Sequence, residues 1–579
     1  LQRVQQGVDF LTTTSRNVPE RHRSLRVVFD QSWQMLSPSE RQVLRRLAVF
    51  RGPFRFDSAA AITGGSLTIL AALFDKSFFR QEGTRYNMHH LLRQYLSGRL
   101  QDADEVQATQ AGYLQYYVEL SRAAAPEVRG ANQIEWLDRL DDEHANIHVA
   151  ILHALEDQQF DAALEIEGNL WLFWQARGHI TEALGWIEPT LVQATNTNTV
   201  AYGNALHAAG FFSWCQGDYD KAEHYHHRAL AIRQKLNDQA GIGVSLNNLG
   251  ILAWAGRRFE EALAFYEQSL ATRRAIGFTY GEATVLRNMG IVFATIGDFT
   301  QARSHYGQAV MLFRQLNDLQ GIAETLHSLG KVAYRNGDYQ QARSYAEEAI
   351  ALSRQVGNYE KIALGLESLT LTAIDLAEYV YAQTSINESL QLYLQVNDKA
   401  GVARDYVLQG WIAYYTHQIP EALELAEQGT NMLRQMTAPE DLGSGILLKA
   451  KCLLKQQHQA MAVRTLGECF SEALHLADFQ VAAEAALELA HIAVQSRQTQ
   501  GKNDLLAVFW QLHKRSYNAL LPRVQAKLAQ IHEQSVLQAR HAAEASFPIA
   551  SVHKQQLSDA EMLGLVDSFA SEFADLKDT

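Results

Sequence analysis

The sequence predicts an all-α protein in which an array of two-helix repeats follows a small helical module with one short β-hairpin. The repeats are indicated by a residue pattern that recurs every 40 positions from Ala201 onward. Within a repeat, apolar residues are spaced by three and four, as in SLNNLGILAWA (245–255), which is the period of an amphipathic helix. Only 9 of the 579 residues are proline and 47% are hydrophobic, a composition typical of an ordered protein.

The small module is expected at residues 25–101. Ser37 and Glu40 have the spacing of a capping box, with Pro38 at the first helical position, so a helix is expected to begin there. A hairpin is expected with its turn at Glu82–Gly83. The predicted helices are residues 24–36, 37–50, 56–62, 66–78 and 89–100, and the predicted hairpin is residues 78–88. Helices followed by a two-stranded hairpin indicate a winged-helix domain.

Each repeat has two marks of close helix packing. One position is alanine in seven successive periods: Ala222, Ala262, Ala302, Ala342, Ala382, Ala422 and Ala462. Twelve residues earlier lies a small residue: Gly210, Gly250, Gly290, Gly330, Thr370, Gly410 and Ala450. We expect these small residues to face each other and to let the two helices approach. An aromatic residue in the turn, as in GDYDKA (217–222), is expected to fill the gap to the next pair.

The second helix of each repeat is expected to end at a residue with left-handed backbone, because Asn or Gly stands there. These residues are Asn237, Asn317, Gly357 and Asn397. The combined Gly, Ala and aromatic signature resembles the tetratricopeptide repeat (TPR) in a 40-residue form. This resemblance implies an α-solenoid, a right-handed superhelix over residues 160–500 with a concave ligand-binding face, and degenerate terminal helices over residues 501–579.

In TPR arrays the first helix of each pair faces the groove. By that resemblance, the residues predicted to line it are His207, Trp214, Asn247, Asn248, Trp254, Arg287, Asn288, His327, Lys331, Tyr334, Arg335, Trp411 and Tyr414. Aromatic and amide side chains with a few cations suit a peptide or a polar small molecule. The same helical spacing also fits side chains that only pack between repeats, so both roles stay open for each residue.

The front of the chain resembles the STAND class of signal-transduction ATPases, which includes bacterial regulators with TPR arrays and is related to NLR-type proteins. The resemblance lies in VPERHRSLRVVFDQSWQMLSPSERQVLRRLAVFRGPF (18–54), LFDKSFF (73–79) and RYNMHHLLRQYL (85–96). It implies a winged-helix domain at residues 25–101 and a helical linker at residues 102–159. Residues 1–24 would then be the tail of an upstream nucleotide-binding domain.

Met88 and His89 match the Met-His-Asp motif of that family, whose histidine contacts the β-phosphate of bound ADP. A histidine at a helix N-terminus can donate to a phosphate oxygen, and the helix dipole favours the anion. His90 stands where the motif has aspartate, so the structural role of that aspartate is in doubt here. A purely structural role for His89 is the main alternative. A shared metal is disfavoured, because adjacent helix residues point about 100° apart.

The resemblance implies the regulatory and ligand-sensing half of such an ATPase. An inducer (a protein, a peptide or a small molecule) would bind the TPR groove, and the winged helix would keep the upstream ATPase in its ADP-bound off state. Oligomerisation would follow only on activation. No GxxxxGK[ST] motif is present, and TQGKND (499–504) lacks its outer residues, so this chain is expected to be no enzyme and to hold no cofactor. ADP or ATP is expected in the full-length protein.

Two alternatives stay open: a DNA-binding transcriptional regulator and a TPR scaffold for protein partners. Residues 25–101 hold 11 Lys and Arg against 5 Asp and Glu, although the whole chain has a net charge of −13. Nucleic acid is not an expected partner, because the helix that would read bases, Leu67–Lys76, carries one Lys and one Asp.

Membrane insertion, disulfides and metal sites are not expected either. The uncharged run Ser58–Phe74 has 17 residues and is too short to span a bilayer. Three widely separated cysteines form no CxxC pair, which favours the cytoplasm. His144 and His148 lie four residues apart without the glutamate of a zinc-protease motif, and Glu223 with His227 is more typical of a solvated helix face.

Overall fold

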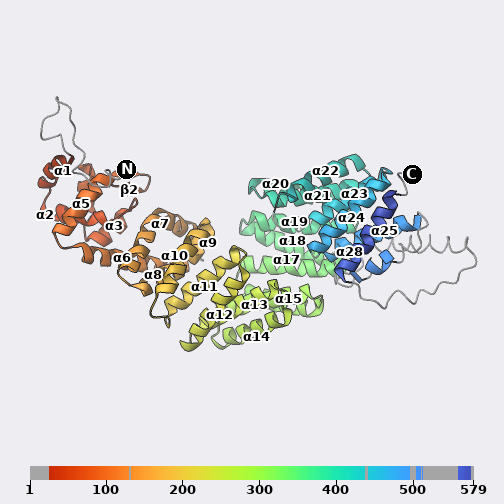
Figure 1. The fold of residues 1–579 in the computed structure, drawn as a ribbon, viewed down its shortest axis with the longest axis horizontal. Coiled ribbons are helices and arrows are strands. Elements are labelled where there is room, and N and C mark those ends of the chain that lie inside the picture. The colour runs from red at the N-terminus through yellow and green to blue at the C-terminus, as the bar shows by residue number, and fades with distance from the viewer. Residues whose placement is uncertain are drawn as a thin grey trace, which may run out of the picture. The chain divides into compact units, whose positions relative to one another are not determined.

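The computed structural model describes residues 25–128, 132–436, 441–476, 478–495, 504–509, 511–512 and 558–575. The chain divides into two compact units, a first unit to Thr272 and a second unit from Arg273, and each is described by itself. The predicted all-α fold with a small hairpin is confirmed (Figure 1). The predicted tail at residues 1–24 and most of the predicted terminal helices at residues 501–579 lie outside the described residues.

The front module has the predicted order of elements. Its helices and strands are α1 (Leu25–Gln34), α2 (Pro38–Arg46), η4 (Leu47–Val49), α3 (Phe56–Thr63), α4 (Leu67–Asp75), β1 (Arg80–Glu82), β2 (Arg85–Asn87) and α5 (His90–Asp102). Ser37 and Glu40 form the predicted capping box at the start of α2. The predicted turn was one residue early. Glu82 pairs with Arg85, so Gly83 and Thr84 make the turn, and Gly83 takes the left-handed conformation that suits glycine.

Aromatic packing holds the hairpin against the helices of the front module. Phe54 exchanges two backbone hydrogen bonds with Tyr86, of 2.9 and 2.7 Å, and so extends the hairpin by one bridge. The ring of Phe56 stacks on Tyr86 with centroids 3.9 Å apart, and Phe79 meets Phe54 edge to face at 5.6 Å. β2 therefore packs against the core of the module through Tyr86, whereas the three residues of β1 are exposed.

Five helices follow in the first unit before the regular repeats begin: α6 (Val106–Glu127), α7 (Gln133–Glu156), α8 (Phe160–Asn169), α9 (Trp171–Arg177) and α10 (Ile180–Gln193). Phe173 and Trp174 of α9 are fully buried, so α9 belongs to the core despite its seven residues. In the described part of the chain no single helix is long and apolar enough to span a membrane. α3 and α4 reach that composition only together, and they are bent by 114° at their junction.

Regular repeats begin at α11. In the first unit they are α11 (Val200–Cys215), α12 (Tyr219–Lys235), α13 (Gln239–Ala255) and α14 (Phe259–Ala275), whose last three residues pass into the second unit. The second unit contains α15 (Thr279–Thr295), α16 (Phe299–Gln315), α17 (Leu319–Arg335), α18 (Tyr339–Gln355), α19 (Tyr359–Asp375), α20 (Tyr379–Gln395), α21 (Lys399–Tyr415), α22 (Ile419–Leu433), α23 (Leu442–Lys455), α24 (Gln459–His475), α25 (Phe479–Gln495) and α28 (Asp559–Asp575).

A left-handed residue every 20 positions sets the repeat. These residues are Gly217, Asn237, Arg257, Gly277, Gly297, Asn317, Gly337, Gly357, Ala377, Asn397, His417 and Gln457. Most helices between them have 17 residues, so a helix and a three-residue turn make 20 and a pair makes 40. The predicted left-handed ends of the second helices are therefore confirmed. The first helices end in the same way, which the sequence analysis did not predict.

The small residues pack differently from the prediction in three repeats. A Cβ added at Gly210 would lie 2.8 Å from the ring of His226. A Cβ added at Gly250 would lie 2.5 Å from the ring of Tyr266, and one at Gly290 would lie 2.6 Å from the ring of Tyr306. The glycine therefore makes room for an aromatic ring on the paired helix, and not mainly for the facing alanine. At Gly330 the predicted arrangement holds, because an added Cβ would lie 3.5 Å from the carbonyl oxygen of Ala342.

Candidate functional site

His89 lies at the junction between the hairpin and α5, as the resemblance implied. It is the N-cap residue of α5, and its Nδ1 accepts a hydrogen bond of 3.3 Å from the Leu91 backbone N–H. Met88 before it is buried, whereas His89 and His90 are exposed. The two imidazole rings stack with centroids 4.5 Å apart. His89 itself therefore caps the helix, a role that does not need the missing aspartate of the motif.

The cap determines which nitrogen of His89 can donate. In a neutral imidazole one ring nitrogen carries the proton and the other accepts. Because Nδ1 accepts from Leu91, Nε2 carries the proton and is the donor. The Arg93 side chain lies close by, since it donates to the Met88 carbonyl oxygen, and burial together with nearby Arg51 lowers the pKa of Arg93.

A buried polar cluster joins the front module to the linker helices. Asn146 of α7 accepts from the Gly52 N–H at 3.1 Å and donates to the Pro53 carbonyl oxygen at 2.7 Å. Glu143, one turn earlier, is fully buried and accepts from the Tyr117 hydroxyl of α6 at 2.7 Å. Burial raises the pKa of Glu143. The cluster ties residues of the front module to both α6 and α7.

Ion pairs surround this cluster and strengthen the same junction. Asp142 of α7 accepts from Thr84 at 3.1 Å and pairs with Arg55 and Arg85, so it contacts both the hairpin and the start of α3. Glu105, just before α6, pairs with Arg45 and Arg46 at the end of α2, and these hydrogen bonds lower the pKa of Glu105. Such half-buried pairs contribute less than the buried cluster, but they fix the orientation of the module on α7.

In the first unit, the predicted groove residues on α11 and α13 form a polar and aromatic cluster. The His207 ring nitrogen Nδ1 lies 3.0 Å from Asn248 Nδ2, and Trp171 of α9 meets the His207 ring edge to face at 5.2 Å. His207 and Asn247 are buried, with 8% exposure each. Trp214 is 36% exposed and Trp254 is half-buried. The histidine and the amides therefore link neighbouring repeats, and Trp214 is the most exposed of the five predicted residues.

In the second unit, several predicted groove residues bind partners on the next first helix. Arg287 of α15 pairs with Glu324 of α17. Tyr334 of α17 donates to Asp375 of α19 at 2.5 Å. Trp411 of α21, 7% exposed, donates from its indole to the Ser444 hydroxyl of α23 at 3.0 Å. The first member of each pair is one of the predicted groove residues, and the second is not.

Two further links of this kind were missed altogether. Arg404 of α21 pairs with Glu367 of α19 at 3.1 Å, and Lys451 of α23 pairs with Glu488 of α25. Their signal in the sequence is a separation of 37 residues, which also separates Arg287 from Glu324. Polar links therefore join successive first helices along the second unit, where the resemblance implied a surface open to ligand.

On α17, one cation of the predicted groove is exposed to solvent. Lys331 is exposed and has no ion-pair partner among the residues that the structure describes. Burial, with Lys331 and Lys361 nearby, lowers the pKa of His327 to about 3, so this histidine is neutral near pH 7. Arg335 donates to the Ala294 carbonyl oxygen at 2.9 Å, and burial lowers its pKa. Anionic groups of a ligand would meet Lys331 first.

The remaining predicted residues have mixed surroundings. Tyr414 packs against Trp411 and Tyr415, with ring centroids 6.0 and 5.4 Å away, and burial raises its pKa to about 12. Asn288 of α15 is half-buried.

The metal-ligating side chains Glu223 and His227 on α12 lie 3.8 Å apart, but Glu223 also pairs with Arg258 at 2.8 Å. That carboxylate is therefore engaged in an ion pair between repeats.

α4, the helix that would read DNA bases, presents few suitable side chains. Leu67, Thr68, Ala71 and Asp75 are exposed, and Leu67 is 61% exposed. Lys76 just after the helix pairs with Glu40 at 2.5 Å. Base recognition needs side chains that match the edges of base pairs, usually Arg, Asn or Gln, and the exposed face of α4 offers none.

Known proteins resemble parts of this chain. Two proteins of Mycobacterium tuberculosis and one of Mycobacterium bovis, all provisionally named HTH-type transcriptional regulators, are 28% identical to it over 187 residues. The match covers 30% of this chain and 21% of each relative, so the chain matches about a fifth of their length.

Solved structures with similar folds include a STAND protein with a tetratricopeptide repeat sensor from Pyrococcus horikoshii. It is 15% identical, with a TM-score of 0.45, and the match covers 72% of this chain and 66% of that one. A Rap protein complexed with competence and sporulation factor is 16% identical, with a TM-score of 0.42 and coverage of 64% and 98%. The quorum sensor NprR from B. thuringiensis is 13% identical, with a TM-score of 0.45 and coverage of 63% and 99%.

The family model of the tetratricopeptide repeat matches two segments, residues 202–275 and 281–355. These segments contain α12 to α14, α16 to α18 and most of α11 and α15, the part of the chain in which the 40-residue period is most regular. The helix lengths, the left-handed residues and this match agree. Residues 202–275 and 281–355 are tetratricopeptide repeats, within an all-α helical repeat array.

Proposed function

We propose that this chain is the regulatory and ligand-sensing part of a signal-transduction ATPase of the STAND class. An inducer binds the first-helix face of the repeats, and the front module holds a nucleotide-binding domain in its ADP-bound off state. The observation that carries this proposal is His89, an exposed histidine at a helix N-terminus whose outward nitrogen is a donor.

His89 is suited to a phosphate oxygen for three reasons. Its Nδ1 is occupied by the Leu91 N–H, so the ring cannot turn without losing the cap. Nε2–H is then presented as a fixed donor. The N-terminus of α5 adds the positive end of its dipole, and the Arg93 side chain lies at the neighbouring Met88 carbonyl oxygen, so a negative charge is favoured here. The β-phosphate of ADP on a neighbouring domain is the ligand that the family resemblance implies.

The junction between the front module and α7 supports transmission of a signal. Asn146 and Asp142 connect α7 to three parts of the module: the loop at Gly52, the start of α3 and the hairpin. A change in the position of α7 therefore moves the whole module and His89 with it. Coupling of this kind needs one element that both sites bias, and α7 with the attached module meets that requirement.

The inducer in this proposal is a peptide or a polar small molecule with an anionic group. Lys331 supplies an exposed cation on the first-helix face of the second unit. The buried polar links along the second unit reduce the number of side chains that can bind a ligand directly. They also give the inducer a means of action, because breaking one link changes how two repeats pack.

Linkage between inducer and ADP tests this proposal. Peptides are first selected from a random library on this chain, with Lys331→Glu expected to weaken the best binder at least tenfold and Lys235→Glu, on the exposed face of α12, as the matched control. The selected peptide is then added to the longer protein with its nucleotide-binding domain. Its ADP affinity should fall by about 5- to 150-fold, and ADP should weaken the peptide by the same factor.

An unchanged ADP affinity at saturating peptide would contradict the sensing role. It would leave the repeats as a scaffold for a protein partner.

A DNA-binding role is the second candidate, because the mycobacterial relatives carry the name of HTH-type transcriptional regulators. A gel shift with residues 1–579 at increasing salt separates the two candidates. We expect only weak binding that moderate salt removes, because the contacts would be with phosphates alone. Binding of one sequence that resists salt would favour the DNA-binding role.

A further inference from the structure

Three metal-ligating side chains meet in the first unit where α7 passes the start of α10. His144 lies in α7, His179 directly precedes α10, and Glu182 lies in the first turn of α10. One ligand atom of each lies within 4.8 Å of the other two. His179 Nδ1 is 3.6 Å from Glu182 Oε2, and His144 Nε2 is 3.9 Å from the same oxygen. The fold therefore brings His144 to a pair separated from it by 35 residues.

A second observation at the cluster points to a ligand. Nε2 of His144 is buried and has no hydrogen-bond partner among the described residues, although it faces Glu182. Buried polar atoms in proteins are nearly always paired, so this nitrogen needs a partner that the chain does not supply.

The surroundings of the cluster are apolar on one side and anionic on the other. Phe173 and Trp186 lie against the His144 ring, with centroids 5.8 and 5.6 Å away. Asp141 is held by Arg177 at 2.7 Å, so it adds negative charge without competing for the ligand position. Apolar walls around a few donor atoms limit access of water and are common around bound metal ions.

We propose that His144, His179 and Glu182 bind one divalent transition-metal ion of the zinc class and so tie α7 to α10. Two imidazoles and one carboxylate form a ligand set that zinc uses, with a fourth position left for water. In a tetrahedral site with bonds of about 2.0–2.1 Å, ligand atoms lie roughly 3.4 Å apart. The two His–Glu distances are close to that value. The histidine rings stack with centroids 4.2 Å apart, so they must turn for both nitrogens to converge on the ion.

The site is independent of the function proposed above, because it involves neither the first-helix face nor His89. Its effects can be measured on this chain alone. A metal ion at this point would join the linker helix α7 to α10 through side chains in addition to apolar packing, and it would stabilise the first unit.

Cobalt is the probe, because tetrahedral Co²⁺ with nitrogen ligands has intense visible absorption. The full chain is stripped with a chelator and titrated with Co²⁺, and Zn²⁺ is then added to displace the cobalt. We expect one equivalent with tetrahedral bands in the wild type. His144→Ala and His179→Ala should each remove the bands, and Glu182→Gln should weaken binding at least tenfold, because a neutral amide oxygen is a poorer ligand than a carboxylate.

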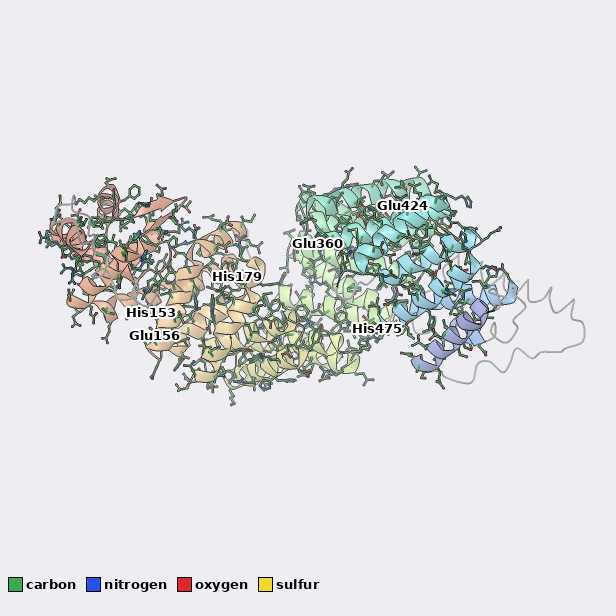
Figure 2. All side chains as sticks on the ribbon, turned by 45° about the horizontal axis from the view of Figure 1, so that its top comes forward. His153, Glu156, His179, Glu360, Glu424 and His475 are labelled. Atoms are coloured by element: carbon green, nitrogen blue, oxygen red, sulfur yellow. The ribbon has the colours of Figure 1, made fainter. Side chains whose placement is uncertain are left out.

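His153→Ala is the matched control. His153 lies in the same helix as His144 and pairs with one carboxylate, with Nδ1 3.4 Å from Glu156 Oε2; both residues are labelled in Figure 2. Among the described residues, His153 belongs to no group of three possible metal ligands. Its loss should leave the cobalt spectrum unchanged, and circular dichroism of the metal-free proteins should show equal helix content in all variants. A wild type without tetrahedral bands would overturn the proposal. Retention of wild-type affinity by His144→Ala and His179→Ala would overturn it too.

Discussion

The carboxamide of Asn146 replaces a missing backbone partner for Gly52: its Oδ1 accepts the Gly52 N–H at 3.1 Å, and its Nδ2 donates to the neighbouring Pro53 carbonyl oxygen at 2.7 Å. The two residues are 94 positions apart. A Cβ at Gly52 would lie 2.9 Å from Ala145 Cβ, so only glycine lets the loop come this close to α7. Asn146 therefore holds the front module to the linker helix α7 through two backbone groups, the Gly52 N–H and the Pro53 carbonyl oxygen, whose positions vary little.

Asn146→Ala should loosen this junction. The change leaves the Gly52 N–H and the Pro53 carbonyl oxygen without partners in a buried place, which costs about 1–3 kcal/mol for each group. Amide hydrogen exchange at Gly52 measures the effect directly and should speed up by at least tenfold. Asn196→Ala, in an exposed loop of the same unit, should leave exchange at Gly52 as in the wild type. Equal exchange in the Asn146 variant would show that Asn146 does not hold the junction.

Substitution of single glycines tests how the repeats pack. Gly250→Ala places a Cβ 2.5 Å from the ring of Tyr266, so the variant should lose about 1–3 kcal/mol of unfolding free energy. Gly307→Ala in α16 is the matched control, because no other group lies within 4 Å of the added atom. It should gain about 0.5–1 kcal/mol, since alanine favours helix over glycine. Urea unfolding measures both. A Gly250 variant as stable as the wild type would contradict the packing described.

Glu167 should make the first unit less stable as pH rises. Full burial raises its pKa from the ordinary value of 4.5 to about 8. The Thr190 hydroxyl lies 2.8 Å from Glu167 Oε1 and 2.9 Å from the Trp186 carbonyl oxygen. One hydroxyl has one proton, so Thr190 can donate to the carbonyl and accept from a protonated Glu167. The folded state therefore favours the neutral carboxyl.

The direction of the pH dependence follows from the pKa of Glu167 in the folded chain and its ordinary value in the unfolded chain. Below pH 4.5 the carboxyl is protonated in both the folded and the unfolded chain. Between about pH 4.5 and 8 only the unfolded chain ionises, so stability falls by roughly 3–5 kcal/mol over this range. Glu167→Gln removes the titration and should be more stable than the wild type at pH 7, with a smaller pH dependence. Thermal unfolding from pH 4 to 9 measures this, and equal slopes for both proteins would contradict it.

Local signals in the sequence predicted most of the fold, and long-range contacts account for what they missed. The left-handed residues at Asn237 and Asn317 could be predicted, because the requirement for Asn or Gly arises within one turn. The partner of Tyr334 could not, since Asp375 reaches it only after two helices have packed. Tyr334, predicted as a ligand-binding residue, therefore also joins two repeats through its hydrogen bond to Asp375.

His89 shows a similar limit. Its place before α5 followed from the family motif, but its role as the cap, and with it the donor at Nε2, depends on the geometry of the turn. The replacement of the motif aspartate by His90 left the capping group undetermined in the sequence.

The rate at which ADP leaves a longer protein that includes the proposed nucleotide-binding domain tests the central claim most directly. A fluorescent ADP analogue is bound, and its release is followed after dilution into unlabelled ADP. His89→Ala removes a charge-assisted hydrogen bond of roughly 1.5–3 kcal/mol, so release should be about 10- to 150-fold faster. His90→Ala, its stacked and exposed neighbour, should release ADP at close to the wild-type rate. If His89→Ala also releases ADP at the wild-type rate, His89 does not hold the phosphate and the proposed off state is wrong.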